Sequence, residues 1–397
     1  MYCIDCGIRI LATAKYCAGC GAQQKTEGVE PTARKDAGSQ EKSATASATA
    51  EQRSRSTPGD HFQNVSDGIT SKLGLDKIEG FSLQNFFSET FRRHDRDEVE
   101  RLLSVGTQET TPLLNARMGV MPSPWIFFRV LSGTIIAYII FLFAWKEFHN
   151  INVMPGLIIV GSFAVPFSVL ILFFELNTPN NISLIKVVQL VVVGGALSIL
   201  LSLFVFEITP FLGAFGASAA GIVEEIGKLA ALLFVIRMVN ADRYKYRLNA
   251  LLLGASVGAG FAAFESAGYA LRYGLNNVDD MLDLIQLRGV FSPFTHIAWT
   301  AIAATAFWIA RPHYDSAAKT VSSSEFLKLF AIPVALHFIW NTPFTGPFMI
   351  KFVVLAFVGW VVIISFVQSG LKEVSEAANF EQIRNNSLSI EKSTTTN

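Results

Sequence analysis

The stretch GIVEEIGKLAALLFVIR, residues 221–237, is apolar enough to lie in a membrane, yet it contains three ionisable side chains. These are Glu224, Glu225 and Lys228. An ionisable group at the centre of a bilayer costs about 2.5 to 3.5 kcal/mol, so three of them facing lipid would cost roughly 8 to 10 kcal/mol. The three side chains must therefore face protein, water or one another.

The spacing of the charges favours one ion pair within this stretch. Glu224 and Lys228 are four residues apart, so they share a helix face and can pair. Glu225 is rotated by about 100° from Glu224 and cannot share that pairing equally. The sequence thus predicts that Lys228 partly neutralises one carboxylate and leaves the other available. Helical geometry alone does not assign which glutamate would hold a water molecule.

Apolar runs on both sides of this stretch predict an all-α polytopic membrane protein. The chain has 397 residues, of which 51% are hydrophobic and 16% charged, against roughly 25% charged in soluble domains. A crossing helix needs about 20 apolar residues. Eight such runs are present, at 124–145, 155–175, 183–206, 211–236, 249–273, 290–310, 326–345 and 350–369.

Three of the other runs also carry polar side chains. Glu265 lies in the fifth, His296 in the sixth, and His337 in the seventh with Asn341 one turn later. Glycines and alanines around them permit close contact between helices. We therefore expect one intramembrane cavity to contain the seven polar residues Glu224, Glu225, Lys228, Glu265, His296, His337 and Asn341.

These side chains together support hydrolysis. A carboxylate beside apolar walls can act as a general base on water, and histidine can share the proton. An amide N–H such as that of Asn341 can stabilise an oxyanion. Two histidines and a glutamate would also satisfy a catalytic zinc. The usual H-E-x-x-H spacing is absent, so the sequence allows a catalytic zinc without requiring it.

Other roles for the polar cluster stay open. A buried ion pair and a membrane histidine can be purely structural, and a non-catalytic receptor or scaffold would keep the same fold. A proton-coupled transporter also places glutamate and histidine inside a membrane. The chain has no evident inverted repeat to favour that transporter.

All four cysteines lie in the first twenty residues, in two C-x2-C pairs separated by ten residues. They are Cys3, Cys6, Cys17 and Cys20. Tetrahedral zinc takes four thiolates, so residues 1–23 are expected to form a zinc ribbon around a structural zinc. Two disulfides are the alternative, but they need an oxidising compartment and no secretory signal opens the chain. The ribbon is expected to dock a protein partner or to regulate the enzyme.

Composition divides the rest of the chain into four parts. Residues 24–66 are polar and are expected to be a disordered linker. Residues 67–122 contain apolar groups at helical spacing, which predicts a cytoplasmic amphipathic segment that packs on the membrane domain or lies at its surface. Residues 123–370 form the transmembrane domain, and residues 371–397 are expected to be a disordered tail.

Lysines and arginines in two loops predict the topology. If the loops 237–247 and 311–328 are cytoplasmic, both termini are cytoplasmic and the acidic loop 274–289 lies outside. The chain is thus expected to be an integral protein of an inner or plasma membrane. Its net charge is zero, so no nucleic-acid partner is expected.

Around the polar residues the sequence resembles the PrsW family of intramembrane proteases. PrsW belongs to a wider glutamate-dependent group that includes the CAAX prenyl endopeptidases. The resemblance covers about residues 120–370. The similar motifs are EEIGK at 224–228, FAAFE at 261–265, HIAWT at 296–300, HFIWN at 337–341 and FFELN at 173–177.

The resemblance implies an endopeptidase that cuts a membrane-anchored, anti-sigma-factor-like protein near the bilayer surface. Glu224 would then be the base that activates water, and Glu225 would support it. Lys228 stands where relatives carry a basic residue after the paired glutamates. His337 and Asn341 would stabilise the oxyanion.

The third glutamate marks a departure from the prenyl proteases. Their corresponding motif ends in a histidine that contacts the catalytic water, whereas here it ends in Glu265, as in PrsW. His296 would then take the place of that histidine. Some names for the family call its members metalloproteases.

Overall fold

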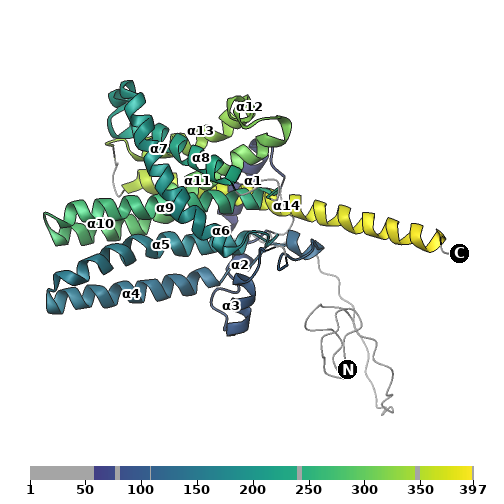
Figure 1. Cartoon of the computed structure of the whole chain (residues 1–397), viewed down its shortest axis with the longest axis horizontal. Coiled ribbons are helices and arrows are strands. Elements are labelled where there is room, and N and C mark those ends of the chain that lie inside the picture. Colours follow the sequence, from purple (N-terminus) through teal and green to yellow (C-terminus); the bar gives the residue numbers. More distant parts are fainter. Residues whose placement is uncertain (1–57, 77–80, 108, 239–243, 345–348, 396–397) are drawn as a thin grey trace, which may run out of the picture. The chain divides into compact units, whose positions relative to one another are not determined.

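The computed structural model of the chain describes residues 58–76, 81–107, 109–238, 244–344 and 349–395 (Figure 1). The expected zinc ribbon at 1–23 and most of the expected linker lie outside these residues. Every regular element in the described part of the chain is a helix, and no strand occurs there. The prediction of an all-α fold is therefore confirmed for these residues.

Six helical segments among the described residues are long and apolar enough to cross a membrane. They coincide with six of the eight expected runs, because hydropathy over about 20 residues is a property of the local sequence. The elements that build them are α4 (Ile126–Phe148); η2 (Ile151–Val153) with α5 (Met154–Leu176); α6 (Leu184–Gln189), the π-helical η3 (Leu190–Gly194) and α7 (Gly195–Ile208); α9 (Arg247–Gly274); α10 (Val278–Phe291), η6 (Ser292–Phe294), α11 (His296–Ala310) and η7 (Arg311–His313); and α14 (Ile350–Thr395).

The two remaining runs fold into α8 (Ala220–Met238) and α13 (Ser324–Trp340), which do not meet the same criteria of length and composition. α8 is preceded by the 3-10 helix η4 (Pro210–Ala219), and α12 (Ala317–Ser322) precedes α13. The expected fourth and seventh spans carry the ionisable groups, which lowers their hydropathy. The count of eight spans therefore stays a prediction.

Helix α8 nevertheless packs along α7 and returns the chain towards the start of α6. The side chain of Asn249, at the start of α9, donates to the Oδ1 atoms of Asn177 and Asn181 at 2.7 and 2.6 Å. The start of α9 thus lies beside the loop that precedes α6. Since α7 leads away from that end, α8 must bring the chain back to it, and its residues Val235 and Ile236 share a small cavity with the start of α6.

Helix α9 forms the centre of the bundle and packs against α5, α7, α10 and α11 (Figure 1). Two of its glycines allow α11 to approach closely. A Cβ atom on Gly254 would meet the Thr300 carbonyl oxygen, and one on Gly258 would meet the carbonyl oxygen of His296. The expected role of small residues in helix packing is thus observed at the position that carries a site histidine.

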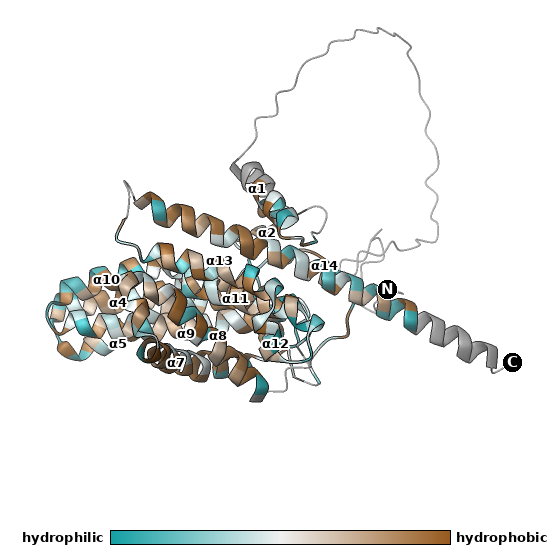
Figure 2. Cartoon of the chain, turned by 90° about the horizontal axis from the view of Figure 1, so that it is seen from above, coloured by the Kyte–Doolittle hydropathy of each residue, from teal (hydrophilic) through white to brown (hydrophobic). Residues whose placement is uncertain are grey.

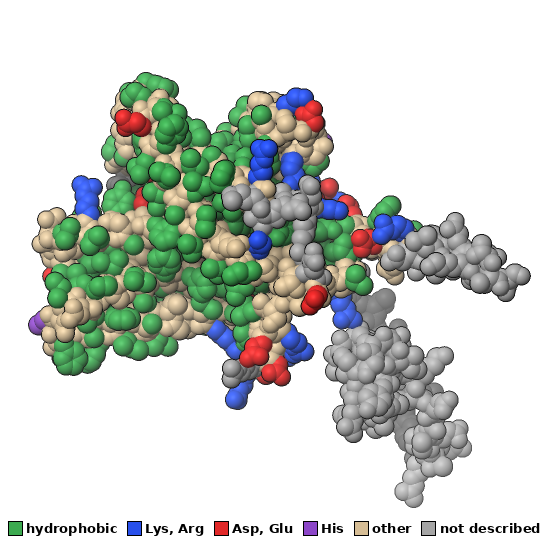
Figure 3. Space-filling model, viewed as in Figure 1, with side chains coloured by type: hydrophobic (Ala, Val, Ile, Leu, Met, Phe, Trp, Pro, Cys, Tyr) green, Lys and Arg blue, Asp and Glu red, His purple; other side chains and the backbone are tan. Residues whose placement is uncertain are grey.

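The outward faces of several helices expose large apolar side chains, as expected for helices in contact with lipid. Leu200, Leu203 and Phe204 of α7 are about 60% exposed. Figure 2 shows α7 as strongly hydrophobic, and Figure 3 shows hydrophobic side chains over most of one face, with charged ones gathered at α12 and near α3 (Arg96–Leu103). These faces fit an integral membrane protein.

The segment before the bundle packs against it. Its elements are α1 (Pro58–Lys72), which begins inside the expected linker, α2 (Leu83–Phe86), α3 and η1 (Ala116–Gly119). Thr70 donates to the Ser365 hydroxyl of α14 at 2.7 Å, and Phe86 is buried. The ring of His94 stacks on Trp125 with centroids 3.6 Å apart. This contact favours a segment that packs on the membrane domain over one that only lies at its surface, although Phe91 remains exposed.

The C-terminal part of the chain differs from the expectation. α14 continues as a helix from the last apolar run to Thr395, where a disordered tail was expected from residue 371. Leu371, Val374 and Ala378 recur at helical spacing and are buried, which extends the apolar face of the helix. The Glu373 carboxylate also accepts from the backbone N–H of Arg247 at 2.8 Å. Because most residues of this segment are polar, its composition alone did not predict the apolar helix face formed by Leu371, Val374 and Ala378.

Candidate active site

Helix α8 begins at Ala220 and carries the two adjacent glutamates about one turn later. Lys228 follows after about one further turn. Glu225 and Lys228 are completely buried, and Lys228 Nζ lies 2.6 Å from Glu225 Oε1. Glu224 Oε2 lies 3.9 Å from the same nitrogen. The expected pairing of Glu224 with Lys228 is therefore present but is the longer of two, since residues three apart also share a helix face and Glu225 lies closer to the lysine.

His337 of α13 accounts for the orientation of Glu225. Its Nδ1 lies 2.8 Å from Glu225 Oε1, and its Nε2 lies 3.8 Å from Glu224 Oε2. The imidazole stacks on the ring of Trp299, with centroids 4.3 Å apart. Gly221 lets α8 and α13 approach here, because a Cβ atom on it would meet the backbone at Phe338. One carboxylate thus holds one nitrogen of the histidine, while the other nitrogen faces Glu224.

His296 is the first residue of α11 and bridges two helices. Its Nδ1 lies 3.0 Å from Lys228 Nζ, and its Nε2 lies 3.1 Å from Glu265 Oε2 on α9. The Lys228 ammonium also lies 4.5 Å from the centroid of the Phe261 ring, a cation–π distance. The lysine therefore contacts a carboxylate, an imidazole and an aromatic face, which together offset its burial.

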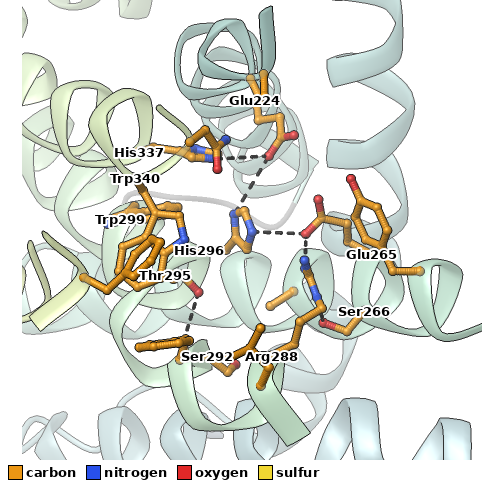
Figure 4. Close-up of a pocket in the computed structure, with 18 of the residues that line it drawn as sticks. Glu224, Glu265, Ser266, Arg288, Ser292, Thr295, His296, Trp299, His337 and Trp340 are labelled. Carbon is orange, nitrogen blue, oxygen red and sulfur yellow. Dashed lines mark hydrogen bonds and ion pairs between the residues drawn. The ribbon is translucent and has the colours of Figure 1, made fainter. Parts of the chain in front are cut away.

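Arg288 of α10 is a site residue that the sequence analysis missed. It forms an ion pair with Glu265, and its Nε donates to the Ser266 hydroxyl at 2.8 Å (Figure 4). Residues 274–289 were expected to form an external loop, but they contain most of the helix α10. The position of Arg288 directly after LIQL, at the border of an apolar run, was the sequence feature that could have indicated a site residue. Trp299 likewise lies within the motif HIAWT at 296–300 but was not expected to be a site residue.

Glu224 projects into a cavity of about 510 Å³, together with Glu265, His296 and His337. Its Oε2 atom is buried and has no hydrogen-bond partner in the described part of the chain. The same atom lies 3.9 Å from His296 Nδ1. A dashed line joins the two residues in Figure 4. A buried carboxylate oxygen normally has a partner. This oxygen and the two imidazole nitrogens therefore surround a space that suits a water molecule or an ion.

Asn341 ends α13 and lines the same cavity, and no hydrogen bond joins its side chain to the other six expected residues. All six of those residues lie within one connected set of contacts through Lys228, Glu224 and His296. The structure thus brings together every site residue expected in the membrane domain. The four cysteines expected to bind zinc lie outside the described residues.

Glu224, His296 and His337 also form a group that could hold a metal ion, with ligand atoms within 4.8 Å of one another. Tetrahedral zinc, with bonds of about 2.1 Å, has ligand atoms roughly 3.4 Å apart. The 3.8 and 3.9 Å from Glu224 to the two histidines are close to this. The second nitrogen of each histidine meets a carboxylate, as is usual for zinc ligands. The donor set therefore fits zinc, provided that Lys228 releases His296 Nδ1.

Residues 182–367 match the family described as PrsW family intramembrane metalloprotease. The match contains all seven expected membrane-site residues, and it confirms the resemblance over a shorter range than the expected 120–370. FFELN lies outside it; Glu175 of that motif accepts the backbone N–H groups of Trp125, Ile126 and Phe127 and so caps α4. No curated protein and no solved structure matches the chain. The family match and the apolar helices support a membrane peptidase.

Proposed function

We propose that this chain, with its PrsW-family region at 182–367, is an endopeptidase that hydrolyses a membrane-anchored protein by water activated at Glu224. The observation that carries the proposal is the buried Oε2 atom of Glu224, which has no hydrogen bond to any residue that the structure describes. Two imidazoles and an ammonium group surround that atom at 3.8 to 3.9 Å. A polar space of this size can hold the attacking water within reach of a general base.

The neighbouring side chains divide the remaining tasks. Lys228 places a positive charge beside Glu224 and stabilises its ionised form, which must accept a proton from water. His337, oriented by Glu225, presents Nε2 to the same space and can take the proton onward to the leaving amine. The Asn341 amide in the cavity wall can donate to the oxyanion. These residues support peptide hydrolysis without a covalent intermediate.

A catalytic zinc fits the same side chains. Glu224, His296 and His337 would hold it, while Glu225 and Glu265 would fix the orientation of the two imidazoles. Bound there, zinc would polarise the peptide carbonyl and lower the pKa of a water ligand. With Glu224 engaged as a ligand, Glu265 is the carboxylate in the cavity left to accept the proton.

We further propose that α8 and α13 cross the membrane together with the six more apolar segments. The packing of α8 against α7, and of α13 against α8 and α11, supports this count of eight. An even number of crossings puts both ends of the membrane domain on one side, and the basic loops favour the cytoplasm. The N-terminal ribbon, with its structural zinc and its protein partner, would then lie in the cytoplasm, and the substrate would be an anti-sigma-factor-like membrane protein.

A comparison of membrane proteomes tests the activity. Cells that express the wild-type chain should contain a shortened single-span protein that stays full-length with Glu224→Gln. Glu207→Gln, the same chemical change at an exposed position near the end of α7, is the matched control and should leave cleavage unchanged. Cleavage that persists in both Glu224→Gln and His337→Ala would overturn the proposed mechanism. Proton flux without any cleavage would favour the transporter instead.

A further inference from the structure

A second cavity, of about 400 Å³, lies between α7 and α9 on the outer side of the candidate active site. We call it the lateral groove and define it by Ser202, Leu203 and Phe206 of α7 and by Phe264 and Tyr269 of α9. Leu203 is 62% exposed, and Phe206 and Tyr269 are each more than a third exposed. The groove therefore opens on a face of the bundle whose neighbouring side chains are apolar and exposed.

The lateral groove is continuous with the active-site cavity. Glu224 and Glu265 line both spaces, so the inner end of the groove is formed by the carboxylates of the site. Phe206 and Tyr269 also line both and form the border between them. A chain lying in the groove would thus reach Glu224 without leaving the apolar surroundings of the bundle.

The chemistry of the groove suits a peptide better than a lipid tail. Its outer wall is apolar except for the exposed Arg272, and either occupant would accept the apolar part. Its inner end presents the Glu224 Oε2 atom, and its α7 wall includes the Ser202 hydroxyl; both oxygens are buried without a hydrogen-bond partner in the described residues. A hydrocarbon chain would leave these groups unsatisfied at a cost of about 1 to 3 kcal/mol each, whereas an unwound peptide offers N–H and C=O partners.

We propose that the lateral groove seats the membrane-embedded segment of the protein substrate beside the bond that is cut. This inference rests on the proposed function, and it adds the route and the substrate chemistry. The substrate would place large apolar side chains against Leu203, Phe206 and Phe264, with its backbone locally extended at Glu224. Entry from the side selects substrates that are already in the bilayer.

Two substitutions on the same helix test the groove. Leu203→Trp fills the groove, while Leu200→Trp places the same bulk one turn earlier, at an equally exposed position that does not line it. For the membrane substrate found in the proteome comparison, Leu203→Trp should raise KM about tenfold or more, with kcat within about twofold, since the lost interaction is one of binding. Leu200→Trp should match wild type.

A soluble peptide spanning the cleaved bond separates a blocked groove from a damaged site. Leu203 does not line the active-site cavity, so Leu203→Trp should slow the cleavage of this peptide much less than that of the membrane substrate. If Leu203→Trp and Leu200→Trp behave alike on the membrane substrate, the groove proposal is wrong even though the protease activity stands. If wild type cuts neither substrate, both proposals fall.

Photo-crosslinking identifies the occupant without relying on turnover. A benzoylphenylalanine at position 203 of the Glu224→Gln chain should crosslink to the same single-span protein that accumulates uncut with that variant, and the same probe at position 200 should not. Crosslinks to lipid alone at position 203, in membranes that contain the uncut protein, would overturn the proposal. Equal crosslinking from both positions would also count against it.

Discussion

The ammonium group of Lys228 lies 2.6 Å from Oε1 of Glu225, and neither side chain is exposed. The same carboxylate oxygen meets His337 Nδ1 at 2.8 Å. Glu225 therefore joins α8 to α13, whereas the preceding Glu224 faces the cavity without a hydrogen bond to its Oε2. Two adjacent, chemically identical residues are thus expected to contribute to different properties, Glu225 to stability and Glu224 to catalysis.

Glu225→Gln should destabilise the protein strongly. The substitution removes the closer of the two carboxylates that pair with the buried Lys228 and leaves Glu224 at 3.9 Å, and breaking a buried ion pair costs about 3 to 5 kcal/mol. The double variant Glu225→Gln/Lys228→Met also removes the poorly compensated positive charge and should recover much of the loss. Thermal unfolding in detergent would measure both. Equal stability of the single variant and wild type would contradict the assigned pairing.

Glu224→Gln should abolish cleavage and leave the unfolding temperature within a few degrees of wild type. Because Oε2 of Glu224 has no hydrogen bond to a described residue, we expect the free energy of unfolding to change by at most about 1 kcal/mol. The measurements are substrate cleavage in membranes and thermal unfolding of the purified chain. A large loss of stability in this variant would show that Glu224 is a structural residue.

Arg288→Met should lower kcat by about 10- to 100-fold, the usual effect of removing a group that orients a site residue. Arg288 acts through Glu265, which contacts His296, so it is a positioning residue. In a double-mutant cycle with Glu265→Gln the two losses should not add. Fully additive losses would place Arg288 in a separate role, and Arg288→Lys should restore part of the rate.

Gly258→Ala should disturb the site by pushing α11 away from α9 at His296. Its Cβ would meet the His296 carbonyl oxygen, and overpacking of this kind costs about 1 to 3 kcal/mol. Gly133→Ala on α4 is the control, because no described atom lies within 4 Å of that added atom and Gly133 lines neither cavity. Activity and thermal unfolding should fall for the first variant only. Similar behaviour of both would mean that α9 and α11 pack less tightly than described.

Metal content should be measured in a chain whose four N-terminal cysteines are replaced by serine. If the catalytic site is a zinc site, about one zinc per chain should remain, held by Glu224, His296 and His337 in the donor set typical of catalytic zinc. Adding His337→Ala should remove it. If the cysteine-free chain contains no zinc and still cuts its substrate, the metal-independent mechanism at Glu224 is the correct one.

The sequence by itself determined where the apolar helices run and which polar residues meet. Hydropathy over about 20 residues is a local property. A charged group in an apolar helix is costly unless it has polar partners. Polar residues inside apolar runs, such as Glu224, His296 and His337, are therefore predicted from the sequence to contact one another. Four separate polar motifs then pointed to one site and to one family.

Only the tertiary structure decided which of these groups pair. Lys228 can reach a carboxylate three or four residues away, and the choice of Glu225 depends on the rotation of α8 against α13, which brings His337 to the same oxygen. The role of Arg288 depends on α10 folding back along α9, a contact between helices that no local pattern contains. The helical structure of the C-terminal segment likewise depends on the packing of its narrow apolar face against other parts of the protein. Which side chains pair depends on contacts between helices. For that reason the spacing of residues along the chain could not predict these pairs.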